Sequence, residues 1–120
     1  MAGSKLGMEA AMATVLEALA NPVRIRILRS LLECSCCQCD LASRLDKHPV
    51  YISRHLAVLS RAGLVTISKE GTRTFPKPAH PEIRQILDLA ERLVQRSASE
   101  KAKEARALRV RPLRVAPTQG

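Results

Sequence analysis

Four cysteines stand within six residues of this chain, and there are no others. They are Cys34, Cys36, Cys37 and Cys39 in the segment Cys-Ser-Cys-Cys-Gln-Cys. In a reducing compartment such crowding favours metal or redox chemistry over a structural disulfide framework. Sulfur is a polarisable donor that selects thiophilic ions, and neighbouring positions supply several donors at once. We therefore predict a thiol-based ligand site at this segment, in preference to four buried structural side chains.

The spacing within the cluster leaves several thiol chemistries open. Cys34-x-x-Cys37 and Cys36-x-x-Cys39 both have redox spacing, so a persulfide or another oxidant is a possible signal. A four-thiolate zinc site is the cramped alternative, because structural zinc sites usually draw two ligands from a second loop. A small thiol oxidoreductase would use Cys34 and Cys37, but the sequence shows no thioredoxin-like βαβ pattern. We therefore expect no enzyme.

Polar side chains also gather at the start of a predicted helix that runs from Pro49 to about residue 61. Its apolar stripe of Ile52, Leu56 and Leu59 would anchor one face to the body of the protein. A shorter helix over about 40–45 precedes it, and two such helices joined by a tight turn make a helix-turn-helix whose second helix enters the major groove. The candidate DNA-binding residues of this helix are His48, Tyr51, Ser53, Arg54 and His55.

A basic hairpin is predicted directly after this helix. Residues 64–68 alternate and are rich in β-branched side chains, Glu70-Gly71 is a turn signal, and residues 73–75 return. Lys69 and Arg73 place positive charge at the tip, where it can approach phosphates or the minor groove. The fold class predicted from these elements is mainly α with a small β-hairpin, a winged helix-turn-helix.

The remaining predicted elements set the domain limits. Residues 9–19 are predicted to form a first helix, and Asn21-Pro22 is a cap signal for a second over about 23–32. Pro76 and Pro78 predict an early end to the second strand of the hairpin, and a last helix is expected over about 82–96. We expect residues 1–8 to be a flexible leader, 9–96 the DNA-binding and dimerisation domain, and 97–120 a basic, disordered tail.

Composition and charge agree with a nucleic-acid partner. Twenty Lys and Arg against eleven Asp and Glu give a formal net charge of +9, and such a surplus favours a polyanion. Only 2% of the residues are aromatic, so the core must be aliphatic, which suits packed helices. No run of about 18 apolar residues exists, so we expect no membrane-spanning segment and a cytoplasmic protein.

The order of several motifs resembles the ArsR/SmtB repressors. The matching segments are Ala-Leu-Ala-Asn-Pro-Val-Arg-Ile-Arg-Ile-Leu at 18–28, Ile-Ser-Arg-His-Leu at 52–56, Ala-Gly-Leu-Val at 62–65 and Glu70-Gly71. The resemblance covers about residues 15–95. It implies a homodimer whose first and last helices pair across a two-fold axis. It also implies binding to an inverted-repeat operator in double-stranded DNA, and release when an inducer binds.

Within that family the cysteine segment is similar to the arsenic(III)-sensing members. Cys37-Gln-Cys39-Asp40-Leu41 resembles the Cys-Val-Cys-Asp-Leu segment that carries thiolates in arsenic and cadmium/lead sensors. Arsenic sensors have a third cysteine where this chain has Ala42, so Cys34 or Cys36 would replace it. Cadmium/lead sensors recruit cysteines from an N-terminal extension, and residues 1–33 contain none. The resemblance thus favours As(III) or Sb(III) as inducer, with cadmium, lead and zinc as alternatives.

The zinc and nickel members of the family use a different site, on the last helix. Here His80 and Glu91 stand on that segment, but no second histidine follows. We therefore expect that site to be incomplete and His80 to cap the helix.

Overall fold

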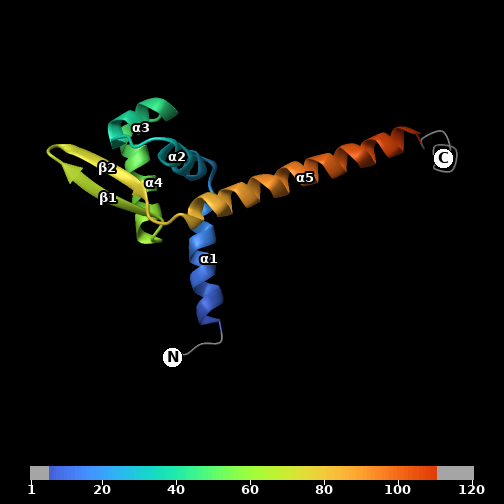
Figure 1. Cartoon of the computed structure of the whole chain (residues 1–120), viewed down its shortest axis with the longest axis horizontal. Helices are drawn as coiled ribbons and strands as arrows, with labels where there is room; N and C mark the ends of the chain where they lie inside the picture. Colours follow the sequence, from blue (N-terminus) through green and yellow to red (C-terminus); the bar gives the residue numbers. More distant parts are fainter. Residues whose placement is uncertain (1–5, 111–120) are drawn as a thin grey trace. The chain divides into compact units, whose positions relative to one another are not determined.

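The computed structural model of the chain describes residues 6–110 (Figure 1). Its elements follow in the order α1 (Gly7–Leu19), α2 (Pro22–Glu33), α3 (Gln38–Leu45), α4 (Pro49–Arg61), β1 (Val65–Glu70), β2 (Arg73–Pro78) and α5 (Glu82–Val110). The expected fold class, mainly helical with one hairpin, is confirmed. Across the described range no helix has both the length and the apolar character needed to cross a membrane.

The chain divides after Gln85 into two compact units. The first contains α1 to α4, the hairpin and the start of α5, and its core is aliphatic, as the scarcity of aromatic residues predicts. Burying such side chains is the main driving force that holds the elements of this unit together. The largest fully buried side chains include Ile27, Leu28, Leu41, Ile52, Leu56, Leu59 and Ile83.

Local signals at the ends of α2 and α4 behave as predicted. The Asn21 side chain accepts hydrogen bonds from the amides of Val23 (2.9 Å) and Arg24 (3.1 Å), which lack partners within the helix. At the end of α4, Gly63 adopts a φ of +80°, and the Leu64 amide returns to the Leu59 carbonyl at 2.9 Å. This is a Schellman-type cap, and it turns the chain from the helix into β1.

The second strand is longer than predicted. β2 runs to Pro78, with Val65 opposite Pro78 and Ile67 opposite Pro76, so the expected early end is wrong. The Ala79 amide donates to the Leu64 carbonyl, which places the amides of alternate β2 residues toward β1. The two prolines have the other parity, so their missing N–H groups face away from the ladder, where an edge strand tolerates proline.

The last helix is also longer than predicted. α5 continues to Val110, past the end expected near Arg96, so the expectation of disorder from residue 97 is wrong up to 110. Residues 97–108 are rich in Ala, Glu and Lys, which are strong helix formers, and the next proline is Pro112. The rest of the expected tail, 111–120, lies outside the described residues, as do residues 1–5 of the expected leader; α1 already begins at Gly7.

Candidate thiol site and nucleic-acid interface

The cysteine segment forms the connection between α2 and α3. Cys34 ends α2, with its amide donating to the Ser30 carbonyl, and residues 34–37 are non-helical. Cys37 is the residue before α3, and Cys39 lies in the first turn of that helix. The thiols therefore stand at the root of the helix-turn-helix, as the sequence predicts.

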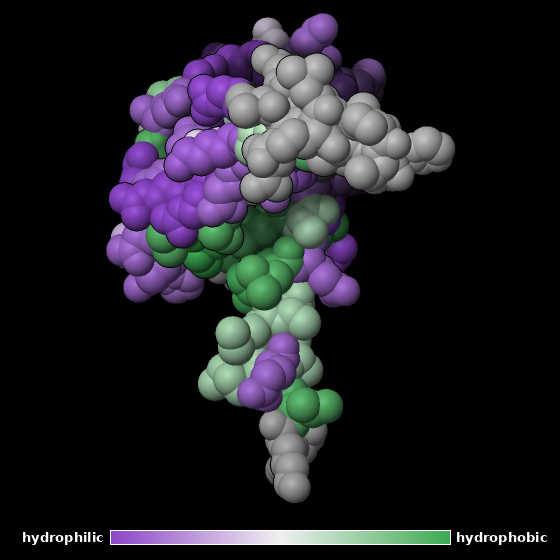
Figure 2. Space-filling view, turned by 90° about the vertical axis from the view of Figure 1, so that its right-hand side faces the viewer, coloured by the Kyte–Doolittle hydropathy of each residue, from purple (hydrophilic) through white to green (hydrophobic). Residues whose placement is uncertain are grey.

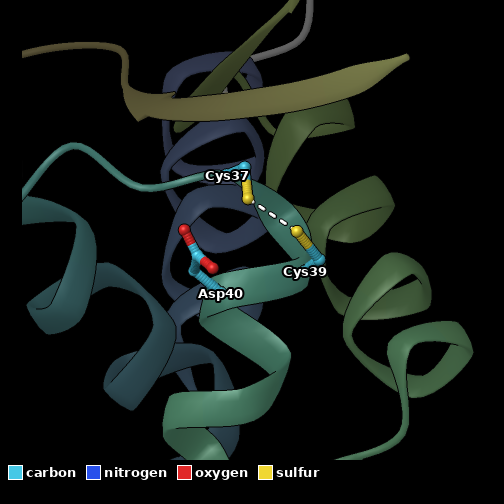
Figure 3. Close-up of side chains that lie close together, drawn as sticks. All are labelled: Cys37, Cys39 and Asp40. Carbon is cyan, nitrogen blue, oxygen red and sulfur yellow. Dashed lines mark hydrogen bonds between the residues drawn. The ribbon is translucent and has the colours of Figure 1, made fainter.

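The four predicted ligands divide into two pairs. In the first pair the sulfur atoms of Cys37 and Cys39 lie 2.7 Å apart, joined by a hydrogen bond, with Cys37 buried and Cys39 exposed (Figure 3). A carboxylate oxygen of Asp40 and both sulfurs lie within 4.8 Å of one another. Asp40 is a candidate ligand that was not predicted from the sequence, although it belongs to the Cys-Gln-Cys-Asp-Leu motif at 37–41.

The second pair, Cys34 and Cys36, faces a cation instead of a carboxylate. The Arg44 guanidinium of α3 donates to the exposed Cys34 sulfur and also pairs with Glu33 at 3.6 Å. Cys36 is buried, with 8% of its surface exposed. The four cysteines predicted as one set of ligands therefore have two different surroundings in the structure.

Burial and thiol–thiol contacts keep two of these cysteines protonated. The hydrogen bond with Cys39, followed by smaller effects that include burial, raises the pKa of Cys37 above its ordinary value. Burial, followed by a side-chain hydrogen bond with Cys34, raises the pKa of Cys36. Both groups enter any reaction at neutral pH chiefly as thiols.

The predicted DNA-facing residues of α4 have different roles in the structure. Tyr51, Ser53 and Arg54 are exposed, on the side of the helix away from its buried stripe. His48 is the N-cap residue, and its Nδ1 accepts from the Val50 amide at 3.1 Å. His55 is half-buried, with its ring edge-on to Tyr51 at a centroid distance of 4.6 Å.

His55 also contacts Arg24, a residue of the 18–28 motif that was not among the predicted functional residues. The Arg24 Nη1 atom lies 3.3 Å from His55 Nδ1, while Nε and Nη2 donate to the carbonyls of Ala18 (2.5 Å) and Glu17 (3.1 Å) in α1. Burial, followed by the nearby positive charge of Arg24, lowers the pKa of His55. Arg24 therefore links α1, α2 and the recognition helix, and the neutral ring of His55 is favoured.

Basic groups border α4 at both the turn and the hairpin. The predicted residues Lys69 and Arg73 are exposed near the β1–β2 turn, with Glu70 opposite Arg73 in the ladder. Lys47, which the prediction omitted, holds its Nζ 5.6 Å from the centre of the Tyr51 ring, at the start of α4. Its position directly before His48 was the signal that could have found it.

Comparisons with known proteins agree with this architecture. Residues 21–66 match the family model described as "Bacterial regulatory protein, arsR family". The HTH-type transcriptional regulator MJ1325 of Methanocaldococcus jannaschii is 35% identical over 82 residues, which cover 68% of this chain and 92% of that protein. The transcriptional activator HlyU of Vibrio cholerae is 37% identical over 79 residues, 66% of this chain and 73% of HlyU.

A solved structure extends the likeness to three dimensions. The homodimeric winged helix-turn-helix DNA-binding domain of Mb0332 from Mycobacterium bovis has a TM-score of 0.70 at 28% identity, covering 79% of this chain and 91% of that domain. The fold described above is therefore a winged helix-turn-helix, and regulatory proteins of this kind are not enzymes. On these matches the chain belongs to the ArsR family of bacterial regulatory proteins.

Proposed function

We propose that this chain is a DNA-binding transcriptional repressor that leaves its operator when As(III) or Sb(III) binds the cysteine segment. The observation that carries the proposal is the 2.7 Å approach of the Cys37 and Cys39 sulfurs at the first turn of α3. Two soft donors are thus already together at the helix that supports the recognition helix α4. The motif resemblance to arsenic sensors points to the same ion.

The chemistry of arsenite suits protonated thiols. Arsenite at neutral pH is the uncharged trihydroxide, and each thiol exchanges for one hydroxide. One As–O bond breaks, one As–S bond forms, and the thiol proton leaves with the hydroxide as water. Three such exchanges complete a pyramidal ion that needs no fourth ligand. The raised pKa values of Cys36 and Cys37 do not hinder this exchange, because no thiolate has to form beforehand.

The third sulfur must come from the connection before α3. Cys37 and Cys39 meet without any unwinding of the helix, whereas Cys34 and Cys36 lie apart from them beside Arg44. Residues 34–37 are not held by a helical ladder, so this segment is the part that moves when Cys34 or Cys36 joins the ion. We infer that this movement re-angles α3, and with it α4, away from the DNA-binding arrangement.

The proposed DNA contacts follow the exposed faces of α4 and the hairpin. Tyr51, Ser53 and Arg54 would face base edges in the major groove, while Lys69 and Arg73 would meet the phosphate backbone. His48 and His55 would act mainly by shaping the helix that presents them. The net charge of +9 supplies the sequence-independent part of the attraction.

We further propose that the repressor acts as a homodimer in the cytoplasm. Apolar side chains are exposed on α1 and on the residue before it, and they are Leu6, Met8, Met12 and Leu16. Figure 2 shows green, hydrophobic patches on the surface of the protein. The α5 segment of the second unit exposes Leu89, Leu93 and Val94. Several exposed apolar side chains on one helix are typical of an interaction site, and a second copy of the chain is the occupant that the homodimeric Mb0332 domain suggests.

A divalent ion is the second candidate inducer, because Asp40 lies beside the first thiol pair. Two sulfurs and a carboxylate oxygen are ligands that zinc accepts, and cadmium and lead are the softer alternatives. Asp40→Asn separates the candidates. It should leave arsenite binding unchanged and weaken zinc or cadmium binding, and unchanged zinc and cadmium binding would remove Asp40 from the ligands of a divalent ion.

Direct binding tests the proposed inducer. Reduced protein is dialysed anaerobically against arsenite, and bound arsenic is counted by elemental analysis. Cys37→Ser and Cys39→Ser should each weaken binding by more than the 10–100-fold typical of losing an outer-shell partner of a metal ligand. Ser35→Ala in the same connection is the matched control and should bind as the wild type does. Equal affinity in the wild type and the Cys37→Ser/Cys39→Ser double variant would overturn the proposal.

A further inference from the structure

The second thiol pair has an electrostatic setting of its own. The Cys34 sulfur is exposed and accepts a hydrogen bond from the Arg44 guanidinium. Arg44 therefore places a positive charge directly beside the exposed sulfur of the pair, the one that an incoming disulfide can reach. The Glu33 carboxylate nearby is already paired with Arg44 at 3.6 Å. Cys36, a side-chain hydrogen-bond partner of Cys34, is the next thiol within reach.

A groove opens beside Cys34, between the end of α2 and the second strand of the hairpin. It has a volume of about 460 Å³, within the range of small-molecule sites. Its lining combines apolar side chains (Leu31, Leu32, Pro76 and Pro78) with two charged ones, the Lys77 ammonium and the Glu33 carboxylate that Arg44 pairs. A small molecule with an apolar body and an anionic group fits this lining, with its reactive atom at Cys34.

We propose that Cys34 and Cys36 form a redox site that reacts with a low-molecular-weight anionic disulfide held in this groove. In the first step the Cys34 sulfur attacks one sulfur of the disulfide. A Cys34 mixed disulfide forms, and one small thiol leaves with the proton that Cys34 gave up. In the second step Cys36 attacks the Cys34 sulfur, which closes a Cys34–Cys36 disulfide and releases the second small thiol. Two cysteines are oxidised, and the small disulfide is reduced to two thiols.

This site is distinct from the proposed arsenic pair. Cys39 is also exposed, but its neighbours in the structure are Cys37 and the Asp40 carboxylate, and a negative group disfavours the approach of an anionic disulfide. The Cys34 groove also has a carboxylate, Glu33, but it is paired with Arg44, and Lys77 adds a second cation. Cys34 and Cys36 are also the candidates for the third arsenic ligand, so their oxidation would compete with arsenite, but the reaction itself needs no metalloid and can be tested in its absence.

The test uses the full reduced chain in chelator-treated, metal-free buffer. Oxidised glutathione is the anionic probe and 2-hydroxyethyl disulfide the neutral one. Samples are quenched with an alkylating agent and read by tandem mass spectrometry. The wild type should lose two hydrogens between Cys34 and Cys36, and Cys36→Ser should instead accumulate the glutathione adduct at Cys34. Cys39→Ser, the matched control from the other pair, should react as the wild type does.

Two further variants decide whether the groove and the assigned nucleophile are right. Lys77→Gln should slow the reaction with oxidised glutathione by about two- to five-fold, the size expected of one exposed charge, and leave the neutral probe unaffected. Cys34→Ser should abolish the fast reaction, with circular dichroism confirming that the variant is folded. Oxidation of Cys34→Ser at the wild-type rate, first modification at Cys39, or equal effects of Lys77→Gln on both probes would each overturn the proposal.

Discussion

Arg24 shows how one side chain ties the recognition helix to the rest of the body. It donates to the carbonyls of Ala18 and Glu17 in the last turn of α1, the second of which also accepts from the Ala20 amide, and it contacts His55 of α4. Hydrogen bonds from a charged donor are worth about 1.5–3 kcal/mol each, less where solvent competes. Arg24→Ala should therefore lower the free energy of unfolding by about 1–3 kcal/mol in urea denaturation. Arg26→Ala, exposed on the same helix, is the control and should change it by at most about 0.5 kcal/mol. Equal losses in both variants would show that the Arg24 contacts add no stability.

His55 gives the stability a dependence on pH. Its pKa is lowered below the ordinary value of 6.5 by burial and by Arg24, so the folded state favours the neutral ring. In the window below pH 6.5 the unfolded chain then binds more protons than the folded one. The stabilisation should be fully present above this window and should be lost as the pH falls through it. The measurement is urea denaturation across that range, compared with His55→Gln, which keeps a polar group beside Arg24. A difference between the two proteins that does not change with pH would contradict this assignment.

At the same scale, the grouping of the four cysteines in the structure differs from the one that the sequence suggested. Crowding alone indicated a single four-thiol cluster. The structure separates it because α3 begins at Gln38, two residues before the predicted start, so Cys37 and Cys39 share a helix turn while Cys34 and Cys36 stay in the connection. Cys37 makes no capping hydrogen bond with its side chain, so no local signal marked the start of the helix. Arg44 lies ten residues after Cys34, and sequence spacing does not predict a side-chain contact over that separation.

At the scale of elements, α4 is the helix whose exposed face is expected to read DNA. Arg54 lies on that face near the N-terminal half of the helix, while Arg61 lies in its last turn, and both are exposed. Arg54→Ala should weaken operator binding by about 1–3 kcal/mol, the cost of losing a good base contact. Arg61→Ala is the matched control and should have a smaller effect. The measurement is a gel-shift titration at fixed salt, and a larger loss for Arg61→Ala would reverse the predicted orientation of the helix.

Element limits were predictable where a cap or a turn marks them. Pro49 and Gly63 bracket α4 in the sequence, and the structure confirms that helix from Pro49 to Arg61. The end of β2 was predicted too early because of its two prolines. The sequence of one strand does not show which of its amides face the neighbouring strand. The end of α5 was missed because no proline or glycine stands between residues 82 and 110, and helix propensity alone continues the helix.

At the scale of the whole molecule, the proposed repressor is a dimer. Leu16 is 54% exposed on α1, in line with Met8 and Met12 at helical spacing. A charge placed there would have to be buried against the partner, so Leu16→Glu should shift the protein toward monomer. Sedimentation velocity at micromolar concentration measures this shift. Ala10→Glu, an exposed position on the other side of α1, is the control and should remain dimeric. An unchanged dimer in Leu16→Glu would place the interface elsewhere.

The family could be predicted from the sequence because its motifs run through the first compact unit in a fixed order. The inducer could not, because two sulfurs and a carboxylate in one turn suit more than one ion. The sequence also does not predict how much the binding of an inducer at the thiols changes the affinity for DNA. By linkage, an inducer that releases the repressor must bind the free form more tightly than the DNA-bound form, typically by about 1–3 kcal/mol.

The most direct measurement of that coupling is the dissociation constant for DNA with and without arsenite. An operator selected from random duplexes is labelled, and binding is followed by fluorescence anisotropy for the wild type and for Cys37→Ser/Cys39→Ser. Both proteins should bind equally without arsenite. Saturating arsenite should weaken the wild type by about 5–150-fold and leave the double variant unchanged. Equal release of both proteins would contradict the proposed mechanism. So would a wild type that binds arsenite and keeps the same dissociation constant for the operator.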